Sequence, residues 1–336
     1  MRGYRLHAFD GAAGLRLEEL PDPVPGPGQA IVHVRACSLN YRDLLVAKGL
    51  YNPKLMLPIV PLSDGAGEVV AVADGVSRVR PGDRVAAAFM PGWVEGPPSD
   101  AKARSALGGG GAGMLAEHVA IDAEGLVKLP AHLSFEEAAT LPCAGVTAWH
   151  ALITEGALRP GETILTQGTG GVSLFATQFA QFAGARVIIT SSRDEKLERA
   201  LALGATEGIN YKTRTDWDAR ARELTGGVGV DHVVELGGAG TLARSFKAVR
   251  TGGRVTLIGV LSGGGEVNPT PALMKNLRVQ GIYVGSRAMF EEMNRAISLH
   301  QVRPVVDRVF EFGQAAEALS YLESGAHFGK IVVRVS

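Results

Sequence analysis

The stretch Thr163-Ile-Leu-Thr-Gln-Gly-Thr-Gly-Gly-Val-Ser173 decides the fold of this chain. Residues 163–167 are apolar and β-prone, which predicts a short buried strand, and a glycine turn follows it. Apolar residues then recur at helical spacing over Leu174–Ala183, and Arg186–Thr190 predicts a second strand. This βαβ pattern is typical of dinucleotide binding. The glycines stand where a backbone approaches a pyrophosphate, and the helix amides from Gly171 onward would point at that anion.

The alternation of strands and helices continues beyond this unit. The third glycine of the G-x-G-x-x-G fingerprint is replaced by Ser173, so the prediction of dinucleotide binding depends on the surrounding pattern of strands and helices. Six strands alternating with helices predict a doubly wound parallel sheet, and the alternative is an α/β domain that binds no nucleotide. The further strands are predicted over 206–210, 230–236, 253–259 and 277–284, and the helices over 194–203, 215–224 (with Thr215 as N-cap) and 239–249.

The end of the second strand bears on which nicotinamide cofactor binds. An NAD-preferring site places a carboxylate about 20 residues beyond the glycines. At that place the chain has Ser191, Ser192 and Arg193, with Lys196 close behind. Hydroxyl and cationic donors suit a 2′-phosphate, whereas a carboxylate would repel it, so we predict NADP(H) rather than NAD(H). Asp194 is expected to begin the next helix, where an acidic residue is favoured.

The bulk composition excludes several classes of protein. At 336 residues the chain is long enough for two domains, and 46% hydrophobic residues with 44 glycines are typical of a folded α/β enzyme. Lys plus Arg and Asp plus Glu both number 34, so no net field favours nucleic acid or an anionic membrane. No signal peptide or membrane span is expected, and only Cys37 and Cys143 are cysteines, so a cytoplasmic location is predicted.

Residues 1–125 differ from the centre of the chain. Short β-prone runs separated by proline and glycine predict an antiparallel β domain with few helices, one of them over Asn40–Lys48. Residues 126–286 are predicted to form the dinucleotide-binding domain, and its first helix has the capping box Ser134-Phe-Glu-Glu137. The elements predicted over 287–336 are too few for a separate domain, so we expect them to fold back onto the N-terminal β domain.

Residues 90–113 form a long irregular insertion that is rich in glycine and proline. Loops of this length inside a compact domain are either lids over a binding site or excursions over the surface. Trp93 favours the lid slightly, since an aromatic side chain there could face a substrate.

Several motifs spread along the chain match a single pattern. They are Ser38-Leu-Asn-Tyr-Arg-Asp43, Pro61-Leu-Ser-Asp-Gly-Ala-Gly-Glu-Val69, Pro81-Gly-Asp-Arg-Val85, Leu141-Pro-Cys-Ala-Gly-Val-Thr147, Gln167-Gly-Thr-Gly-Gly-Val172, Leu203-Gly-Ala205 and His327-Phe-Gly-Lys330. With these motifs the chain resembles the medium-chain dehydrogenase/reductase superfamily from end to end. The resemblance implies a GroES-like β domain and a Rossmann domain, in agreement with the pattern above, but it names no substrate.

The chain departs from its zinc-dependent relatives at the metal positions. Zinc-dependent alcohol dehydrogenases of the family hold the metal with a cysteine, a histidine-plus-acid pair and a later cysteine. By this resemblance, Asn40 stands at the place of the first cysteine, and Ser63, followed by Asp64, stands at the place of the histidine. Only Cys143 remains, at the place of the later cysteine. A catalytic zinc needs about three protein donors, so we predict no metal. The four-cysteine structural lobe of those enzymes is absent as well.

Without zinc, the chain is similar to the quinone oxidoreductase and enoyl reductase branch, which implies hydride transfer from NADPH to a quinone or α,β-unsaturated carbonyl. Gly49-Leu-Tyr51 matches that branch, and Tyr51 would donate a proton or hold the carbonyl, or else only shape the pocket by stacking. Asn40 would orient a carbonyl by hydrogen bonding, or else stabilise its loop. A metal-free alcohol dehydrogenase or ketone reductase is the alternative enzyme, and a non-catalytic nucleotide-binding protein is the third hypothesis.

The resemblance also implies the cofactor contacts and the assembly. Strand 277–284 would pair across a two-fold axis with a second copy to make a homodimer, unless the loops around 263–270 cover this edge. The implied cofactor residues are Thr147, Gly170, Gly171 and Val172 at the pyrophosphate and ribose, Ser192, Lys196 and Tyr211 at the 2′-phosphate, Gly259, Val260, Val284, Gly285 and Ser286 at the nicotinamide, and Lys330 from the last motif.

Overall fold

The computed structural model describes residues 1–336 and divides the chain into two compact units. The first unit contains residues 1–146 and 284–336, and the second contains residues 147–283. The sequence pattern placed these divisions at 125/126 and 286/287 instead. Residues 126–146 fall in the first unit because their strand β7 (Leu126–Lys128) pairs with β5 (Arg84–Ala87). A strand of three residues is too short to show an alternating pattern in the sequence.

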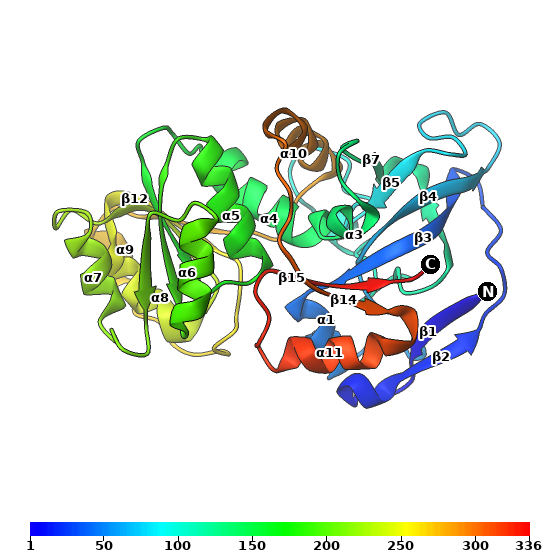
Figure 1. Cartoon of the computed structure of the whole chain (residues 1–336), viewed down its shortest axis with the longest axis horizontal. Helices are drawn as coiled ribbons and strands as arrows, with labels where there is room; N and C mark the ends of the chain where they lie inside the picture. The colour runs from blue at the N-terminus through cyan, green and yellow to red at the C-terminus, as the bar shows by residue number, and fades with distance from the viewer. The chain divides into compact units, whose positions relative to one another are not determined.

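The second unit is built on a six-stranded, all-parallel sheet, as the sequence predicts. Its strand order is β10–β9–β8–β11–β12–β13, and Figure 1 shows α5 and α6 on one face with α7 and α8 on the other. The strands are β8 (Thr163–Gln167), β9 (Arg186–Ser191), β10 (Glu207–Asn210), β11 (Val230–Glu235), β12 (Val249–Leu257) and β13 (Arg278–Gly281). The helices are α5 (Gly171–Phe182), α6 (Asp194–Ala202), α7 (Trp217–Glu223), α8 (Ala239–Ala248) and α9 (Thr270–Met274), while α4 (Val146–Trp149) lies between π-helical turns at Leu141–Gly145 and His150–Thr154.

The central strands of this sheet are covered on both faces. Every residue of β8 is buried, and Leu165 and Ile188 have no exposed surface. Each such side chain contributes about 1.5–3 kcal/mol of hydrophobic stabilisation relative to an exposed one. The predicted N-cap Thr215 is wrong, because α7 begins later with Asp216 as its N-cap. The buried Trp217 fixes that start, since the first helical turn has to bring the indole into the core.

Burial of His232 on β11 makes the stability of the protein depend on pH. Desolvation lowers its pKa from the ordinary value of 6.5 to about 3. The unfolded chain therefore binds more protons than the folded one between these values, so stability falls as the pH drops below 6.5. We expect a loss of about 2 kcal/mol from this group between pH 7 and pH 5.

Urea unfolding followed by circular dichroism at both pH values measures this loss. The variant His232→Leu is the matched comparison, because Thr256, the ring's hydrogen-bond partner, also donates to Val233 O at 3.3 Å. An equal pH dependence in His232→Leu and the natural protein would contradict the assignment.

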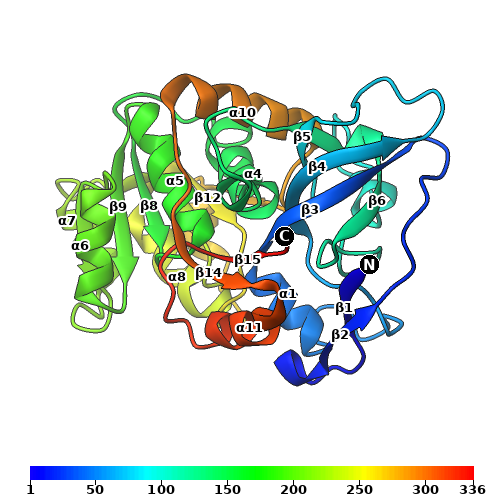
Figure 2. The ribbon, with the colours of Figure 1, turned by 45° about the vertical axis from the view of Figure 1, so that its right-hand side comes forward.

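The first unit is a largely antiparallel sheet with the order β14–β15–β3–β4–β5–β7, and β6 also pairs with β3. Figure 2 shows the C-terminal strands joined to the N-terminal sheet, which confirms that the tail folds back. The remaining strands are β1 (Arg2–Leu6), β2 (Leu15–Glu19), β3 (Gln29–Leu39), β4 (Asp64–Val72), β6 (His118–Asp122), β14 (Val306–Glu311) and β15 (Lys330–Arg334). Its helices are α1 (Tyr41–Ala47), α2 (Asp100–Ala103), α3 (Phe135–Ala138), α10 (Arg287–His300) and α11 (Ala315–Glu323). No helix of the chain is long and apolar enough to cross a membrane.

Two local predictions in the first unit have different outcomes. The Ser134 capping box is confirmed, with Ser134 Oγ accepting from Glu137 N at 3.1 Å. Trp93, in contrast, is only 2% exposed, and its Nε1 donates to Gly96 O at 2.8 Å. The expectation that Trp93 faces a substrate is therefore wrong in this structure. The ring anchors the segment 90–113, because a large apolar side chain gains most from burial.

Candidate active site

A buried polar cluster in the first unit joins the four positions that the sequence compares with zinc ligands. Asp64 Oδ2 accepts from Cys143 N at 3.1 Å, and Asp64 Oδ1 accepts from Ser63 Oγ at 2.7 Å. Lys330 Nζ donates to Asn40 Oδ1 at 2.6 Å and also to Leu39 O. Asn40 is the N-cap of α1, while Asp64 and Lys330 are the first residues of β4 and β15. The chain thus brings these distant segments together around one lysine.

Burial dominates the electrostatics of this cluster. It raises the pKa of Asp64, against the opposing effects of Lys330, the Asn40 amide, Ser63 and the Cys143 amide. Burial also raises the pKa of the neighbouring Asp43 to about 6. The pKa of the Cys143 thiol is raised by burial and by Asp64, so the thiol stays neutral. A neutral thiol is a poor nucleophile.

The residues of the cluster do not fit a catalytic zinc. Across the described chain, no group of three or more His, Cys, Asp or Glu side chains is arranged to hold a metal ion. Both oxygens of Asp64 already accept hydrogen bonds, and Asn40 and Ser63 replace two of the strong ligands. A catalytic zinc requires three such ligands with an open fourth position.

Arg42 holds the aromatic ring of Tyr51, and the sequence analysis gave Arg42 no role. Its guanidinium carbon lies 4.9 Å from the Tyr51 ring centroid and 4.7 Å from that of Phe89. Arg42 Nη1 donates to Leu107 O at 2.6 Å. A Cβ atom at residue 109 would lie 2.2 Å from Arg42 Nη2, so a larger residue in place of Gly109 would force the guanidinium to shift. Tyr51 follows the C-terminal end of α1, whereas Asn40 precedes its N-terminal end.

The glycine turn of the second unit lies between β8 and α5, where the sequence predicts a pyrophosphate site. Gly168 follows β8 with φ of +74°, a left-handed conformation that favours glycine, and Gly170 is the N-cap of α5. The first amides of α5 have no acceptor inside the helix and are available to an anion. Ser173 replaces the third glycine because its Oγ donates to Gln167 O at 2.7 Å, which ties the helix to the strand. Gly171 and Val172 form the first turn of α5.

The residues predicted to surround a 2′-phosphate lie around the end of β9. Ser191 is the last residue of that strand, and its Oγ accepts from Arg193 N at 3.4 Å. Tyr211 N donates to Ser191 O at 3.0 Å, so this tyrosine follows the adjacent end of β10. Asp194 begins α6, as expected, and accepts from Asn210 Nδ2 at 2.7 Å. Ser192 and Lys196 are half-buried in the same segment.

A cavity of about 340 Å³ lies beside Tyr211, and two cationic residues that the sequence did not predict for the 2′-phosphate site line it. These are Lys212, which follows β10, and Arg244 on α8. No spacing rule connects them, since they come from different elements. The sequence could have suggested them only through the rule that ligands bind beyond the carboxyl ends of neighbouring parallel strands. The other lining residues are Thr215, Trp217 and Gly240.

The remaining predicted residues are divided between the two units. Thr147 is buried in α4, and Gly259 and Val260 follow β12 in the second unit. Val284, Gly285 and Ser286 open the second part of the first unit. Val284 has φ of +53°, which is strained for a β-branched residue. Ser286 is the N-cap of α10 and accepts from Met289 N at 3.3 Å, which gives it a structural role as well.

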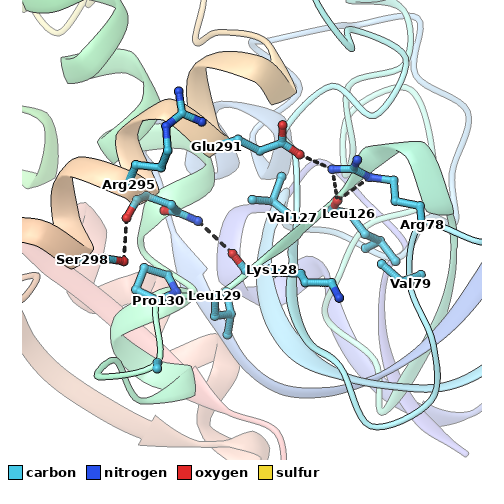
Figure 3. A pocket seen from close by; sticks show the side chains of 12 residues that line it. Arg78, Val79, Leu126, Val127, Lys128, Leu129, Pro130, Glu291, Arg295 and Ser298 are labelled. Carbon is cyan, nitrogen blue, oxygen red and sulfur yellow. Dashed lines mark hydrogen bonds and ion pairs between the residues drawn. The ribbon is translucent and has the colours of Figure 1, made fainter.

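A larger hollow of about 640 Å³ lies on the first unit beside α10 and contains none of the predicted site residues (Figure 3). Figure 3 shows Arg78 paired with Glu291, and Arg78 Nε also donates to Leu126 O at 3.1 Å. Asn294 Nδ2 donates to Lys128 O at 3.0 Å. These bonds brace α10 against β7, and they offer no group suited to hydride transfer.

Comparisons with known proteins identify the family. Residues 26–131 match the alcohol dehydrogenase GroES-like domain, and residues 171–299 match the zinc-binding dehydrogenase domain. A zinc-type alcohol dehydrogenase-like protein, C1773.06c of Schizosaccharomyces pombe, is 46% identical over 341 residues, covering 99% of each chain. The chain therefore belongs to the medium-chain dehydrogenase/reductase superfamily, with a GroES-like domain and a Rossmann domain, and it is an oxidoreductase.

More distant relatives span two kinds of activity. The human quinone oxidoreductase is 28% identical over 326 residues, covering 95% of this chain and 92% of its own. A crystal structure described as an NAD-dependent alcohol dehydrogenase has a TM-score of 0.91 at 36% identity, with full coverage of both chains. Mycobacterial Rv1454c, in complex with NADPH, has a TM-score of 0.85 at 27% identity, again with full coverage of both.

Proposed function

We propose that the protein is a cytoplasmic, NADP(H)-dependent oxidoreductase that reduces a quinone or an α,β-unsaturated carbonyl without zinc. The observation that carries this proposal is the Asn40–Lys330–Asp64 cluster, which fills the metal positions with groups that cannot form a catalytic zinc site. The likeness to human quinone oxidoreductase supports the substrate class. The cysteines Cys37 and Cys143 are both free, which suits a reducing compartment.

Asn40 supplies the hydrogen bond that a carbonyl substrate needs. The bound nicotinamide provides the hydride, and negative charge then develops on the carbonyl oxygen of the acceptor. The Asn40 Oδ1 atom is occupied by Lys330, whereas the buried Nδ2 atom has no hydrogen-bond partner. The Asn40 amide lowers the pKa of Asp64, but its Nδ2 atom makes no hydrogen bond of acceptable geometry to that carboxylate. An amide donor fixed in advance stabilises an oxyanion at little cost in reorganisation.

Tyr51 provides the second polar group of the site. Its ring is held against the Arg42 guanidinium, so its orientation is set before a substrate arrives. In this proposal the phenol holds the carbonyl and supplies a proton, while a hydride adds to carbon, so that the acceptor gains a hydride and a proton, which together are two electrons and two protons. The proton returns to the phenol from solvent.

The cofactor preference follows from the groups at the end of β9. Ser191, Ser192, Arg193 and Lys196 bring hydroxyl and cationic donors there. Of the two acidic residues in the first turn of α6, Asp194 is engaged by Asn210, and Glu195 follows it. The NADPH complex of Rv1454c supports this preference, whereas the NAD-dependent alcohol dehydrogenase leaves NAD(H) as the competing assignment.

A metal-free alcohol dehydrogenase or ketone reductase is the second candidate, favoured by the alcohol dehydrogenase-like relatives. Oxidation of NADPH against matched quinones, enones, ketones and aldehydes separates the candidates. The proposal expects turnover with quinones or enones and at least tenfold lower kcat/KM with saturated ketones. Faster turnover with saturated ketones would favour the second candidate, and no turnover with any acceptor would favour a non-catalytic nucleotide-binding protein.

We also propose a homodimer paired through β13. This strand ends the parallel sheet and its residues are exposed, and Leu273 and Met274 nearby are exposed as well. Ile282 N donates to Leu257 O within the chain at 2.9 Å. Alternate amides of a strand point to opposite sides, so the Val279 amide is directed to the open edge.

The variant Val279→Pro is expected to dissociate the dimer, because proline removes an edge donor and keeps the bonds to β12. Sedimentation at micromolar concentration is the measurement, and Val228→Pro, in an exposed loop outside the sheet, controls for an unspecific effect of proline. A monomeric natural protein, or a Val279→Pro variant that stays dimeric, would refute this arrangement.

A further inference from the structure

Lys330 is a buried lysine at the centre of the polar cluster. Its side chain is almost inaccessible to solvent, and its Nζ donates to Asn40 Oδ1 at 2.6 Å and to Leu39 O. Asp64 opposes the lowering of the Lys330 pKa by burial, and Lys330 lowers the pKa of Asp64 in return. A buried cation is tolerated only with such partners, because desolvation of an unpaired charge is costly.

The hydrogen bonds of the Lys330 ammonium group bear on its predicted role as a cofactor-binding residue. An ammonium has three N–H donors. Two are used by Asn40 and Leu39, and Asp64, Cys143 and Asp43 oppose the lowering of the Lys330 pKa by burial. These contacts belong to the catalytic cluster, and they differ from those of a lysine held ready for a cofactor phosphate.

We propose that Lys330 is the internal cation of this site, in place of the metal of zinc-dependent relatives, and that it positions the Asn40 amide. The ammonium and the buried Asp64 carboxylate each oppose the effect of burial on the other's pKa. It also holds Asn40 Oδ1, which turns the Nδ2 donor away from the lysine and leaves it for the substrate. The proposal has two parts. The charge part is that Lys330 is the cation at the metal position, and the positioning part is that it orients the Asn40 amide. Only the positioning part rests on the proposed function.

Zinc binding tests the charge part without any turnover. The variant Asn40→Cys/Ser63→His restores, together with Cys143, the three ligands that the family resemblance implies. We expect this variant to bind zinc chloride at least tenfold more weakly than Asn40→Cys/Ser63→His/Lys330→Met, because a nearby ammonium repels the metal ion. Equal zinc affinities, or no zinc binding by either variant, would overturn the assignment of Lys330 to the metal position.

A double-mutant cycle tests the positioning part. Lys330→Met is expected to lower kcat for a quinone at least tenfold and to change the NADPH dissociation constant less than twofold. In the Asn40→Leu background the same substitution should change kcat less than twofold, because the lysine acts through the amide. Additive losses of kcat would contradict positioning, and a large loss of NADPH affinity would return Lys330 to the cofactor site.

A charge-balanced variant protects the kinetic test against misfolding. Lys330→Met leaves Asp64 without its cation, whereas Lys330→Met/Asp64→Asn removes both charges and is used if the single variant fails to fold. Lys330→Arg keeps the charge and should recover part of the lost kcat, and no recovery would count against the proposal. If the natural protein turns over no acceptor, the proposed function fails, while zinc binding still decides the charge assignment.

Discussion

The substitution Asn40→Leu is expected to lower kcat/KM for a quinone or enone by about 10²–10³-fold, the usual cost of losing one oxyanion donor. Leucine has nearly the shape of asparagine but offers no N–H group. The amide nitrogen is the group that matters, because Lys330 already occupies the amide oxygen. Steady-state oxidation of NADPH with a fixed acceptor is the measurement.

One control separates catalysis from stability in this variant. Asn40 is also the N-cap of α1, so its loss should cost about 1 kcal/mol of stability. Asn40→Ser retains a good N-cap residue without the amide, and it should lose activity like Asn40→Leu while keeping the natural stability. An Asn40→Ser variant with kcat/KM within twofold of the natural protein would show that the amide does not take part in the reaction.

Removing cations near the end of β9 is expected to produce the second large effect. Lys196→Ala should weaken NADPH binding by about 10–100-fold, because a charge-assisted hydrogen bond contributes about 1.5–3 kcal/mol. Binding of NADH should change less than twofold, since NADH lacks the 2′-phosphate. Arg244→Ala tests the cation that lines the adjacent cavity, and the same selective loss is expected.

Fluorescence titration with both reduced cofactors measures these losses. Lys48→Ala is the matched control, because Lys48 is a surface lysine paired with Glu323 in the first unit. Tighter binding of NADH than of NADPH by the natural protein would contradict the NADP(H) assignment. Equal losses for both cofactors in Lys196→Ala would remove this lysine from the 2′-phosphate site.

The parallel sheet could be predicted from the sequence because its signals are local. Each buried strand is a short apolar run, and each helix carries apolar residues at its own spacing. The strands over 163–167 and 186–191 and the helix from Asp194 follow these rules closely. The division of the chain was harder to place, because three-residue β7 is defined by its pairing with β5 and not by any pattern of its own.

The site could be predicted only in part. Asn40, Asp64 and Cys143 stand in motifs, and the structure joins their segments through Asp64 and Lys330. The bond from Lys330 to Asn40 connects residues 290 positions apart, and no spacing rule reaches that far. Arg42 was missed for the same reason, since its contacts with Tyr51 and Phe89 arise only from folding.

Trp93 shows the opposite error, in which a residue type suggested a role that its surroundings exclude. An aromatic residue in a long loop is as well suited to anchoring as to binding. Its hydrogen bond to Gly96 O and its burial favour the anchor, and neither could be read from composition.

We propose that this chain transfers hydride from NADPH to a conjugated carbonyl or quinone without a metal. The most direct test is the rate of NADPH oxidation by a quinone, measured on protein treated with a chelator and analysed for zinc in the same sample. We predict full activity with less than about one zinc per ten chains, as expected where a catalytic zinc lacks its three ligands. Activity that is lost on chelation and restored by one zinc per chain would contradict the account.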